Sequence, residues 1–288
     1  MSLVPLTENE HRFAEAFKQF RKASDQESLM KQWIVDDLPK VIHSNPSTVK
    51  FMDTNVIQIL GIGSGFGNMD MLIFDVFGNN NQKVNEIVLE PNKVEVEKFK
   101  STIKSLDQYR FVNLECLPET VESYMARNTS RKFHFIHCIH VLYYVKNPAA
   151  IIEAAYNCLE EGGMMLIIHA AASHGINHVK NTFGAKLFAS PPKYTPNGSQ
   201  LEKLVHDLGY KYSSDIINAK LDMTECQNPA SQNGNLIWDF ITHVASFTEN
   251  ASPEIKGAIN DVTKSEFCYR NGGKVFMNID SSVLIIVK

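Results

Sequence analysis

The middle of the chain alternates between short apolar runs and stretches in which apolar residues recur with helical spacing. The run 57–62 is apolar and rich in β-branched side chains, which indicates a buried strand. Met69, Leu72 and Phe74 then begin a helical pattern. This order of strand, turn and helix predicts an α/β fold built on a doubly wound sheet.

Further apolar runs predict the other strands, at 86–90, 109–115, 133–144 with its exit loop, 164–169, 210–217, 275–278 and 282–287. Helices are predicted at 92–105, from Pro148 to just before Gly162, at 199–208, and in a segment headed by 236–240. A loop-like connection is expected over 170–196, which includes Pro191 and Pro192, and the stretch 221–235 is polar. We expect the last two strands to form a pair.

The glycines that follow the first strand are Gly61, Gly63, Gly65 and Gly67. Glycine lets the backbone turn sharply and lets a ligand approach the main chain. The G-x-G-x-x-G pattern of dinucleotide sites fails here, because its third position would hold Phe66 or Asn68. The remaining G-x-G-x-G pattern resembles motif I of S-adenosylmethionine-dependent methyltransferases. The alternative is an ordinary strand-to-helix turn.

An acid ends the second predicted strand. Glu90 would lie beside the glycine turn, where a carboxylate can accept hydrogen bonds from ribose hydroxyls. Pro91 follows it and suits the first position of a helix, so Glu90 could instead be the N-cap of that helix. One residue could fill both roles.

Composition narrows the class of protein. Hydrophobic residues make up 44% and charged residues 21% of the 288 residues, which is typical of a soluble globule. The net charge of −4 gives no basic surface for nucleic acid. Five scattered cysteines without a C-x-x-C pair suit a reducing compartment. With no signal peptide and no apolar run of about 18 residues, we expect a soluble, cytoplasmic protein. We also expect a monomer whose partner is a small molecule.

The segment before the glycine turn is predicted to form two helices. Thr7-x-x-Glu10 and Ser24-x-x-Glu27 match the capping-box pattern. Aromatic residues follow the first box with helical spacing, and they suit either the core or a lid over a ligand site.

The exit of the fourth predicted strand offers several side chains that could take part in chemistry: His137, His140, Tyr143 and Tyr144. We do not expect His137-x-x-His140 to bind zinc, because a zinc site needs a third and usually a fourth ligand. Methyl transfer from a sulfonium needs a neutral nucleophile held in line and a dry pocket. Aromatic faces help there through cation–π attraction.

Five segments together resemble the histamine N-methyltransferase family: 59–63, 88–91, 142–146, 236–240 and 275–278. The resemblance runs along nearly the whole chain. It implies an α/β, Rossmann-like class I methyltransferase with a mostly parallel seven-stranded sheet and helices on both faces. It also implies one domain over 1–288, with a core at about 50–220 and a small substrate lid from about 1–45 and parts of 172–198 and 221–275.

The same resemblance implies the reaction and the site residues. The family methylates an imidazole nitrogen of a small amine with S-adenosyl-L-methionine and no metal. By position, the cofactor would contact Gly63, Glu90, Glu95, Thr120, Val121 and Ile139. The substrate would contact Phe17, Phe20, Tyr143, Tyr144, Phe240 and Asn278.

The chain departs from the family in the substrate half. The acid that pairs with the ammonium group of histamine falls at Gln26, with Asp25 and Glu27 beside it. A glutamine at the end of the fourth strand is replaced by His140, which can take up a proton near neutral pH. Ile176 and Lys180 stand in the stretch where the family has tryptophans.

These departures suggest the same reaction on an altered acceptor, with His140 as the candidate catalytic residue and Gln26 as a substrate contact. The acceptor could be histamine, an imidazole dipeptide such as carnosine, or an arylalkylamine. A cofactor-binding protein without turnover is the second hypothesis. Hydride transfer with a nicotinamide cofactor is disfavoured by the glycine spacing.

Overall fold

The computed structural model describes residues 3–45, 54–78, 82–127, 130–188 and 196–288. The chain divides into two compact units. Unit 1 consists of Met1–Leu29, Ala170–Asn197 and Ile216–Ser281, and unit 2 of Met30–His169, Gly198–Asp215 and Ser282–Lys288. None of the helices in the described ranges combines the length and hydropathy that a membrane span requires.

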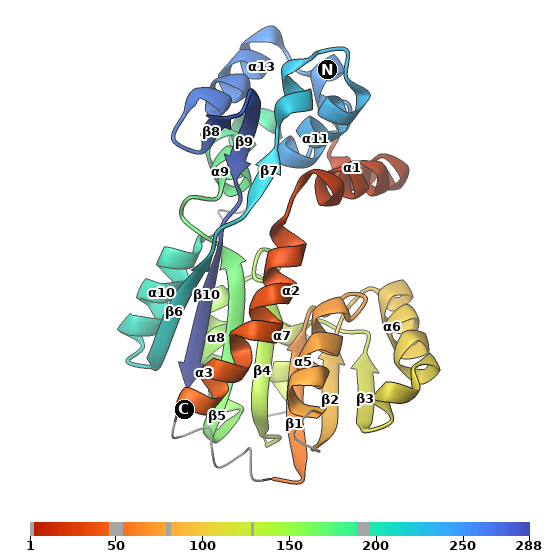
Figure 1. Cartoon of the computed structure of the whole chain (residues 1–288), viewed down its shortest axis with the longest axis vertical. Helices are drawn as coiled ribbons and strands as arrows, with labels where there is room; N and C mark the ends of the chain where they lie inside the picture. The colour runs from red at the N-terminus through yellow and green to blue at the C-terminus, as the bar shows by residue number, and fades with distance from the viewer. Residues whose placement is uncertain (1–2, 46–53, 79–81, 128–129, 189–195) are drawn as a thin grey trace. The chain divides into compact units, whose positions relative to one another are not determined.

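A seven-stranded sheet forms the centre of unit 2, in the order β3-β2-β1-β4-β5-β10-β6 (Figure 1). Its strands are β1 (Val56–Ile62), β2 (Lys83–Leu89), β3 (Val112–Leu117), β4 (Phe133–Ile139), β5 (Leu159–Ala170), β6 (Lys211–Ile217) and β10 (Ser281–Val287). The pairs β3-β2, β2-β1, β1-β4 and β4-β5 are parallel. This mostly parallel sheet confirms the fold class that the sequence predicts.

The last strand runs against its neighbour. Lys288, at the end of the chain, exchanges backbone hydrogen bonds with Gly162 and Gly163 near the start of β5. Ala171, after the end of β5, donates to the carbonyl of Asp280, just before β10. β10 is therefore antiparallel to β5.

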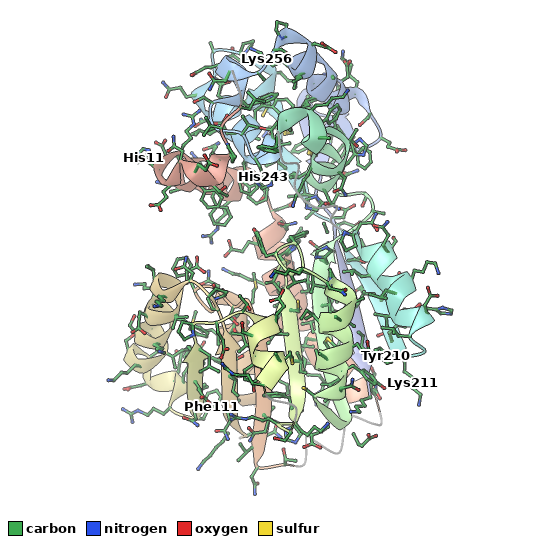
Figure 2. All side chains as sticks on the ribbon, turned by 180° about the vertical axis from the view of Figure 1, so that it is seen from behind. His11, Phe111, Tyr210, Lys211, His243 and Lys256 are labelled. Carbon is green, nitrogen blue, oxygen red and sulfur yellow. The ribbon has the colours of Figure 1, made fainter. Side chains whose placement is uncertain are left out.

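Helices cover both faces of this sheet. The helices of unit 2 are α2 (Gln26–Asp36), which contains the unit boundary, α3 (Leu38–Ser44), α5 (Asn68–Gly78), α6 (Lys93–Ser105), η2 (Asp107–Tyr109), α7 (Val121–Arg127), α8 (Pro148–Asn157) and α10 (Gly198–Asp207). Side chains of α7, α8 and α10 share one hydrophobic cluster with the strands. Figure 2 shows this face from behind, with Tyr210 and Lys211 marking the start of β6. α3 lies in front of the sheet in Figure 1.

Unit 1 has its own core around a three-stranded antiparallel sheet in the order β7-β9-β8. The strands are β7 (Lys220–Asp222), β8 (Cys268–Asn271) and β9 (Lys274–Asn278). The helices are η1 (Leu6–Glu8), α1 (Glu10–Ala23), α9 (Gly175–Leu187), η3 (Thr224–Gln227), α11 (Gln232–Thr242), α12 (Phe247–Asn250), α13 (Pro253–Asn260) and η4 (Asp261–Lys264). Apolar residues of α9, α11 and β9 form a shared hydrophobic cluster.

Two predictions about the later part of the chain are wrong. β9 and β10 do not pair, because β9 belongs to the small sheet and β10 to the large one. Residues 175–187, expected to be a loop, form α9, whose first turn is capped by the Nδ1 atom of His174 accepting from the backbone N–H of Asn177. The remaining part of that predicted loop, Pro191 and Pro192, lies outside the described residues. The polar stretch 221–235 contains η3 and the start of α11.

The predicted helix caps are also wrong at three places. α1 begins after Asn9, whose side chain accepts from the backbone N–H of Arg12, so Thr7 is not its cap. Ser24 is the C-cap of α1 and does not start the second helix. Asn92 caps α6, which removes the N-cap alternative for Glu90.

Candidate active site

The ends of four parallel strands meet at one edge of the sheet in unit 2. Ile62 on β1 is in register with Leu89 on β2 and with Cys138 on β4, and Leu89 is in register with Leu117 on β3. The loops that follow these strands therefore gather at the carboxyl edge, where open α/β sheets bind ligands.

A cleft of about 390 Å³ lies at this edge. It is lined by residues from all four loops and from the helices that follow two of them: Ile62, Gly63, Gly65, Leu89, Glu90, Pro91, Asn92, Glu95, Thr120, Val121, Glu122, His140, Val141, Tyr144 and Val145. The cleft thus brings together Gly63, Glu90, Glu95, Thr120 and Val121, five of the six residues that the resemblance assigns to the cofactor. Ile139, the sixth, lines a smaller cavity beside it.

The glycine loop is shaped by two backbone requirements. Gly63 has a φ of 67°, a left-handed conformation that residues with a side chain rarely adopt. A Cβ atom there would also lie 2.2 Å from Cγ2 of Val141, in the loop after β4. Glycine at this position therefore lets the loop turn and lets Val141 pack against its main chain, and both residues line the cleft.

Glu90 holds this loop in place. One of its carboxylate oxygens accepts from the backbone N–H of Gly65 at 3.0 Å, and the other accepts from that of Asn92 at 2.9 Å. The carboxylate is thus oriented by two main-chain donors, and each oxygen keeps a further lone pair for a ligand hydroxyl.

Acidic side chains dominate the electrostatics of the cleft. Burial, together with the charge of Glu90, raises the pKa of Glu95. Burial acts to raise the pKa of Glu122 as well, but the backbone N–H of Lys146, 3.0 Å from its Oε1, and other hydrogen bonds hold it below the usual value. The described lining contains neither lysine nor arginine. The cleft therefore favours a cationic ligand over an anionic one.

His140 lies at the exit of β4 in a left-handed conformation, with a φ of 52°. Its backbone N–H donates to the carbonyl of Ile168 at 2.8 Å. Its Nδ1 atom lies 2.8 Å from the hydroxyl of Tyr143, whose ring stacks on buried His169 with 4.2 Å between centroids. Tyr144 packs edge-on against Tyr143 and is 82% exposed at the cleft. These contacts fix the imidazole of His140 within the lining of the cleft.

The predicted substrate residues from the rest of the chain lie in unit 1. Phe17 and Phe20 project from α1 and contact Phe240 of α11, with ring centroids 5.8 and 4.2 Å from that of Phe240. Phe13 stacks on Phe17 at 6.0 Å. We refer to these four rings as the aromatic cluster. Phe17 is 40% exposed, so the cluster presents an aromatic face to solvent.

Gln26 is committed to structure within unit 1. Its Nε2 atom donates to the carbonyl of Ile279 at 2.9 Å and to the hydroxyl of Ser281 at 3.3 Å. The side chain is only 8% exposed. Asn278, the last residue of β9, is half-buried, and its backbone N–H donates to the carbonyl of Phe267.

The two acids beside Gln26 already have partners in unit 1. A carboxylate oxygen of Asp25 accepts from the backbone N–H of Lys220 at 2.7 Å. Glu27 accepts from Arg21 at 2.6 Å. Both carboxylates are therefore already held by hydrogen bonds within unit 1.

Sequence reasoning missed Val141 and Glu122 in the cleft and a buried group of Asp70, Glu86 and His137 beneath the glycine loop. A signal for the buried group was available, because Glu86 and His137 interrupt strands that are otherwise apolar. Polar side chains in such strands need partners.

The cleft fits S-adenosylmethionine. Gly63 lines it with main-chain atoms, and Glu90 presents a carboxylate that two backbone donors orient and that can accept from a ligand hydroxyl. The acidic lining suits a positively charged sulfonium. Thr120, Val121 and Val145 supply neutral and apolar surface for a planar base.

Comparisons with known proteins agree with this site. A family model described as a methyltransferase domain matches residues 14–214. Histamine N-methyltransferase of Danio rerio is 26% identical, covering 98% of this chain and 97% of that protein. Histamine N-methyltransferase of Bos taurus is 27% identical, covering 99% of this chain and 98% of that protein. These matches confirm the resemblance that the sequence motifs indicate.

Solved structures support the fold. The YcgJ protein of Bacillus subtilis has a TM-score of 0.53 at 16% identity and covers 85% of this chain and 98% of its own. A cyclopropane-fatty-acyl-phospholipid synthase-like protein of Lactobacillus casei has a TM-score of 0.54 at 12% identity and covers 89% of this chain and 92% of its own. Because the family model spans most of the chain and the sheet has the expected order, this chain belongs to the methyltransferase-domain family and is a class I, S-adenosylmethionine-dependent methyltransferase.

Proposed function

We propose that the enzyme methylates a nitrogen atom of a small imidazole or aromatic amine, with a histamine-like acceptor as the first candidate. The observation that carries this proposal is His140, an imidazole held by Tyr143 in the lining of an acidic cleft. The two histamine N-methyltransferases that match nearly the full chain support it. An imidazole dipeptide of the carnosine type and an arylalkylamine are the alternatives, because Gln26 is uncharged.

S-adenosylmethionine, when bound, supplies a methyl group on a positively charged sulfur. The chain's own task is to hold a neutral nitrogen in line with that methyl group and to keep water away. Such orientation can lower the activation barrier by roughly 7 kcal/mol or more. The acidic side chains at Glu90 and Glu95 stabilise positive charge in the cleft. The exposed ring of Tyr144 can add cation–π attraction.

The role of His140 depends on the acceptor. An aliphatic amine has a pKa of about 10 and must lose a proton before it can attack. His140 can accept that proton at Nε2 when its Nδ1–H donates to the Tyr143 hydroxyl; in the opposite tautomer, Nε2–H can only orient the acceptor. An imidazole acceptor is mostly neutral at pH 7, so orientation is sufficient.

The test is the release of S-adenosylhomocysteine by the purified enzyme over a panel of imidazoles, imidazole dipeptides and arylalkylamines. We expect turnover with at least one of these classes. Each acceptor is paired with a control in which the reactive nitrogen is already methylated, and this control should not react. Cofactor binding without turnover on any amine would favour the non-catalytic hypothesis, and NAD binding would favour hydride transfer.

Several assignments remain predictions. They include substrate contacts by Phe17, Phe20, Tyr143, Tyr144, Phe240, Asn278 and Gln26, and cofactor contacts by Gly63, Glu90, Glu95, Thr120, Val121 and Ile139. The division into a core and a substrate lid, and a monomer in the cytoplasm, also remain predictions.

A further inference from the structure

Three titratable side chains meet beneath the glycine loop, and the proposed reaction uses none of them. Asp70 comes from α5, Glu86 from β2 and His137 from β4, and each is only 1% exposed. Nε2 of His137 lies 3.1 Å from Glu86 Oε1 and 3.4 Å from Asp70 Oδ1. With a proton on Nε2, His137 can donate to either acid. We call these three residues the buried triad.

The triad touches the loop from below. A Cβ atom at Gly61 would lie 3.0 Å from Asp70 Oδ1, 3.0 Å from Cε1 of His137 and 2.5 Å from the hydroxyl of Ser64. The triad and Ser64 therefore fill the space that a side chain at Gly61 would need. The first glycine of the motif is thus required by the triad rather than by a ligand.

A cavity of about 50 Å³ lies between the triad and the loop. Its lining combines loop residues with two members of the triad: Ile62, Gly63, Ser64, Met69, Asp70, His137 and Ile139. This volume is enough for an ordered water molecule. None of the triad residues lines the larger cleft, so each can reach the cofactor only through the loop.

The triad holds more protons than the same groups hold in water. Burial raises the pKa of Glu86 to about 8, and the neighbouring charge of Asp70 adds to this effect. Burial also raises the pKa of Asp70, although His137 acts against it. Burial disfavours the charged ring of His137, but Asp70 and Glu86 raise its pKa above the ordinary value. Near pH 7 Glu86 is therefore mostly protonated, which removes one negative charge from the triad.

Among the described residues, few other titratable groups act on the triad. Glu90, at the end of β2, adds negative charge near Asp70. The thiol of Cys116 on β3 faces Glu86, but burial raises its pKa to about 12, so it stays neutral. Among described atoms, Asp70 Oδ1, Glu86 Oε2 and the Ser64 hydroxyl accept or donate no hydrogen bond. An ionised Glu86 would therefore have only the His137 ring N–H at Oε1, and no donor at Oε2, to stabilise its charge.

We propose that Asp70, Glu86 and His137 are positioning residues that hold the glycine loop in the conformation that receives the cofactor, through their contacts at Gly61 and Ser64. This inference rests on the assignment of the glycine loop to the cofactor. Loss of the Glu86 proton above neutral pH adds a negative charge under the loop, beside Asp70, and loosens the loop.

The first test measures S-adenosylhomocysteine affinity against pH for two isosteric variants. Asp70→Asn leaves His137 without its anion, and we expect about tenfold weaker binding at pH 7. Glu86→Gln mimics the protonated acid, so binding at pH 7 should stay near wild type. Wild-type affinity should fall as the pH rises through about 8, and Glu86→Gln should lose this fall. The control is His134→Gln, because His134 is also on β4 and contacts β1 through the backbone N–H of Gln58.

The second test uses the cofactor-free enzyme and therefore does not depend on the proposed function. Hydrogen exchange of the loop amides from 63 to 67 should be faster in Asp70→Asn than in wild type and unchanged in His134→Gln. Unchanged exchange together with an unchanged pH profile in both isosteric variants would overturn the proposal. A stoichiometric metal ion in the purified protein would also overturn it, since the three groups would then be metal ligands. If Asp70→Asn fails to fold, the pH profile of Glu86→Gln decides.

Discussion

The cleft of unit 2 and the aromatic cluster of unit 1 differ in the groups that form them. Main-chain atoms and acidic side chains line the cleft: Gly63 contributes main chain, and Glu90 is held by two backbone N–H groups. The cluster is made of interchangeable side chains, with Phe17 exposed on a helix. A backbone site tolerates few residues, whereas an aromatic surface can change by single substitutions. We infer that the cofactor half is the fixed part of this enzyme and the acceptor half the adjustable part.

The variant with the largest expected effect is Gly63→Ala, which tests whether the backbone of the cleft tolerates a side chain. Its methyl group would meet Val141 at 2.2 Å on a left-handed backbone, so we expect cofactor affinity to fall about hundredfold, or on the order of 3 kcal/mol. Calorimetry with S-adenosylhomocysteine measures it. Gly209→Ala is the matched control, because Gly209 has a φ of 73° but nothing within 4 Å of its Cβ position. Equal affinity in the two variants would show that the loop does not need its glycine.

His140→Ala tests the chemistry of the cleft. We expect turnover to fall by at least about tenfold, since general-base or orienting groups contribute on the order of a hundredfold, while cofactor affinity stays unchanged. Steady-state rates with calorimetry on the same preparation separate the two effects. Tyr143→Phe removes the hydroxyl that contacts Nδ1 and should give a smaller loss. Wild-type turnover in His140→Ala would exclude the residue from the mechanism.

Gln26→Glu tests whether this position in unit 1 is structural. A carboxylate cannot donate to the carbonyl of Ile279, so we expect a loss of about 1–3 kcal/mol in the free energy of unfolding at pH 7. A protonated glutamic acid can donate. Its pKa in the folded state should therefore exceed the unfolded value of about 4.3, and the deficit should grow as the pH rises from there.

Gln26→Met is the control for that pH dependence. It removes the same donors without adding a charge, so its deficit should not vary with pH. Chemical denaturation at several pH values measures both variants. A pH-independent deficit in Gln26→Glu would mean that the new carboxyl group reaches solvent.

Phe17→Ala has the smallest expected effect and tests the aromatic cluster of unit 1. Removal of an exposed ring should raise KM for the acceptor by a few-fold, about 0.5–1.5 kcal/mol, and leave cofactor affinity and thermal stability nearly unchanged. Leu106→Ala, which removes an exposed apolar side chain away from the glycine loop, serves as a control in unit 2. A change in cofactor affinity in Phe17→Ala would contradict the separate roles of the two regions.

The sequence predicts much of unit 2 and less of unit 1 for a physical reason. Long apolar strands such as β4 and β5 can be recognised from their composition, and the glycines mark the turn after β1. α9 was missed because Gly175 and polar residues open it, and its cap is a histidine. The separation of β9 from β10 depends on contacts distant in sequence, which no local pattern reports.

The site shows the same limit. Residues of the cleft that follow strands, such as Glu90 and His140, could be located from the strand order alone. Glu86 and His137 can be singled out as polar residues in apolar strands, but their meeting with Asp70 could not be predicted, because the three positions are joined only when three elements pack together. That Gln26 is used for packing also depends on the distant residues Ile279 and Ser281.

The two backbone hydrogen bonds to Glu90 have a consequence for the regulation of the enzyme's activity. Our assignment of Glu90 to the ribose predicts firm binding of the nucleoside end, because a carboxylate already oriented by Gly65 and Asn92 loses little entropy when a sugar binds. Spent donor carries that same end. We therefore expect the demethylated product to compete strongly with fresh donor, so that the rate in a cell follows the ratio of the two rather than the donor concentration alone.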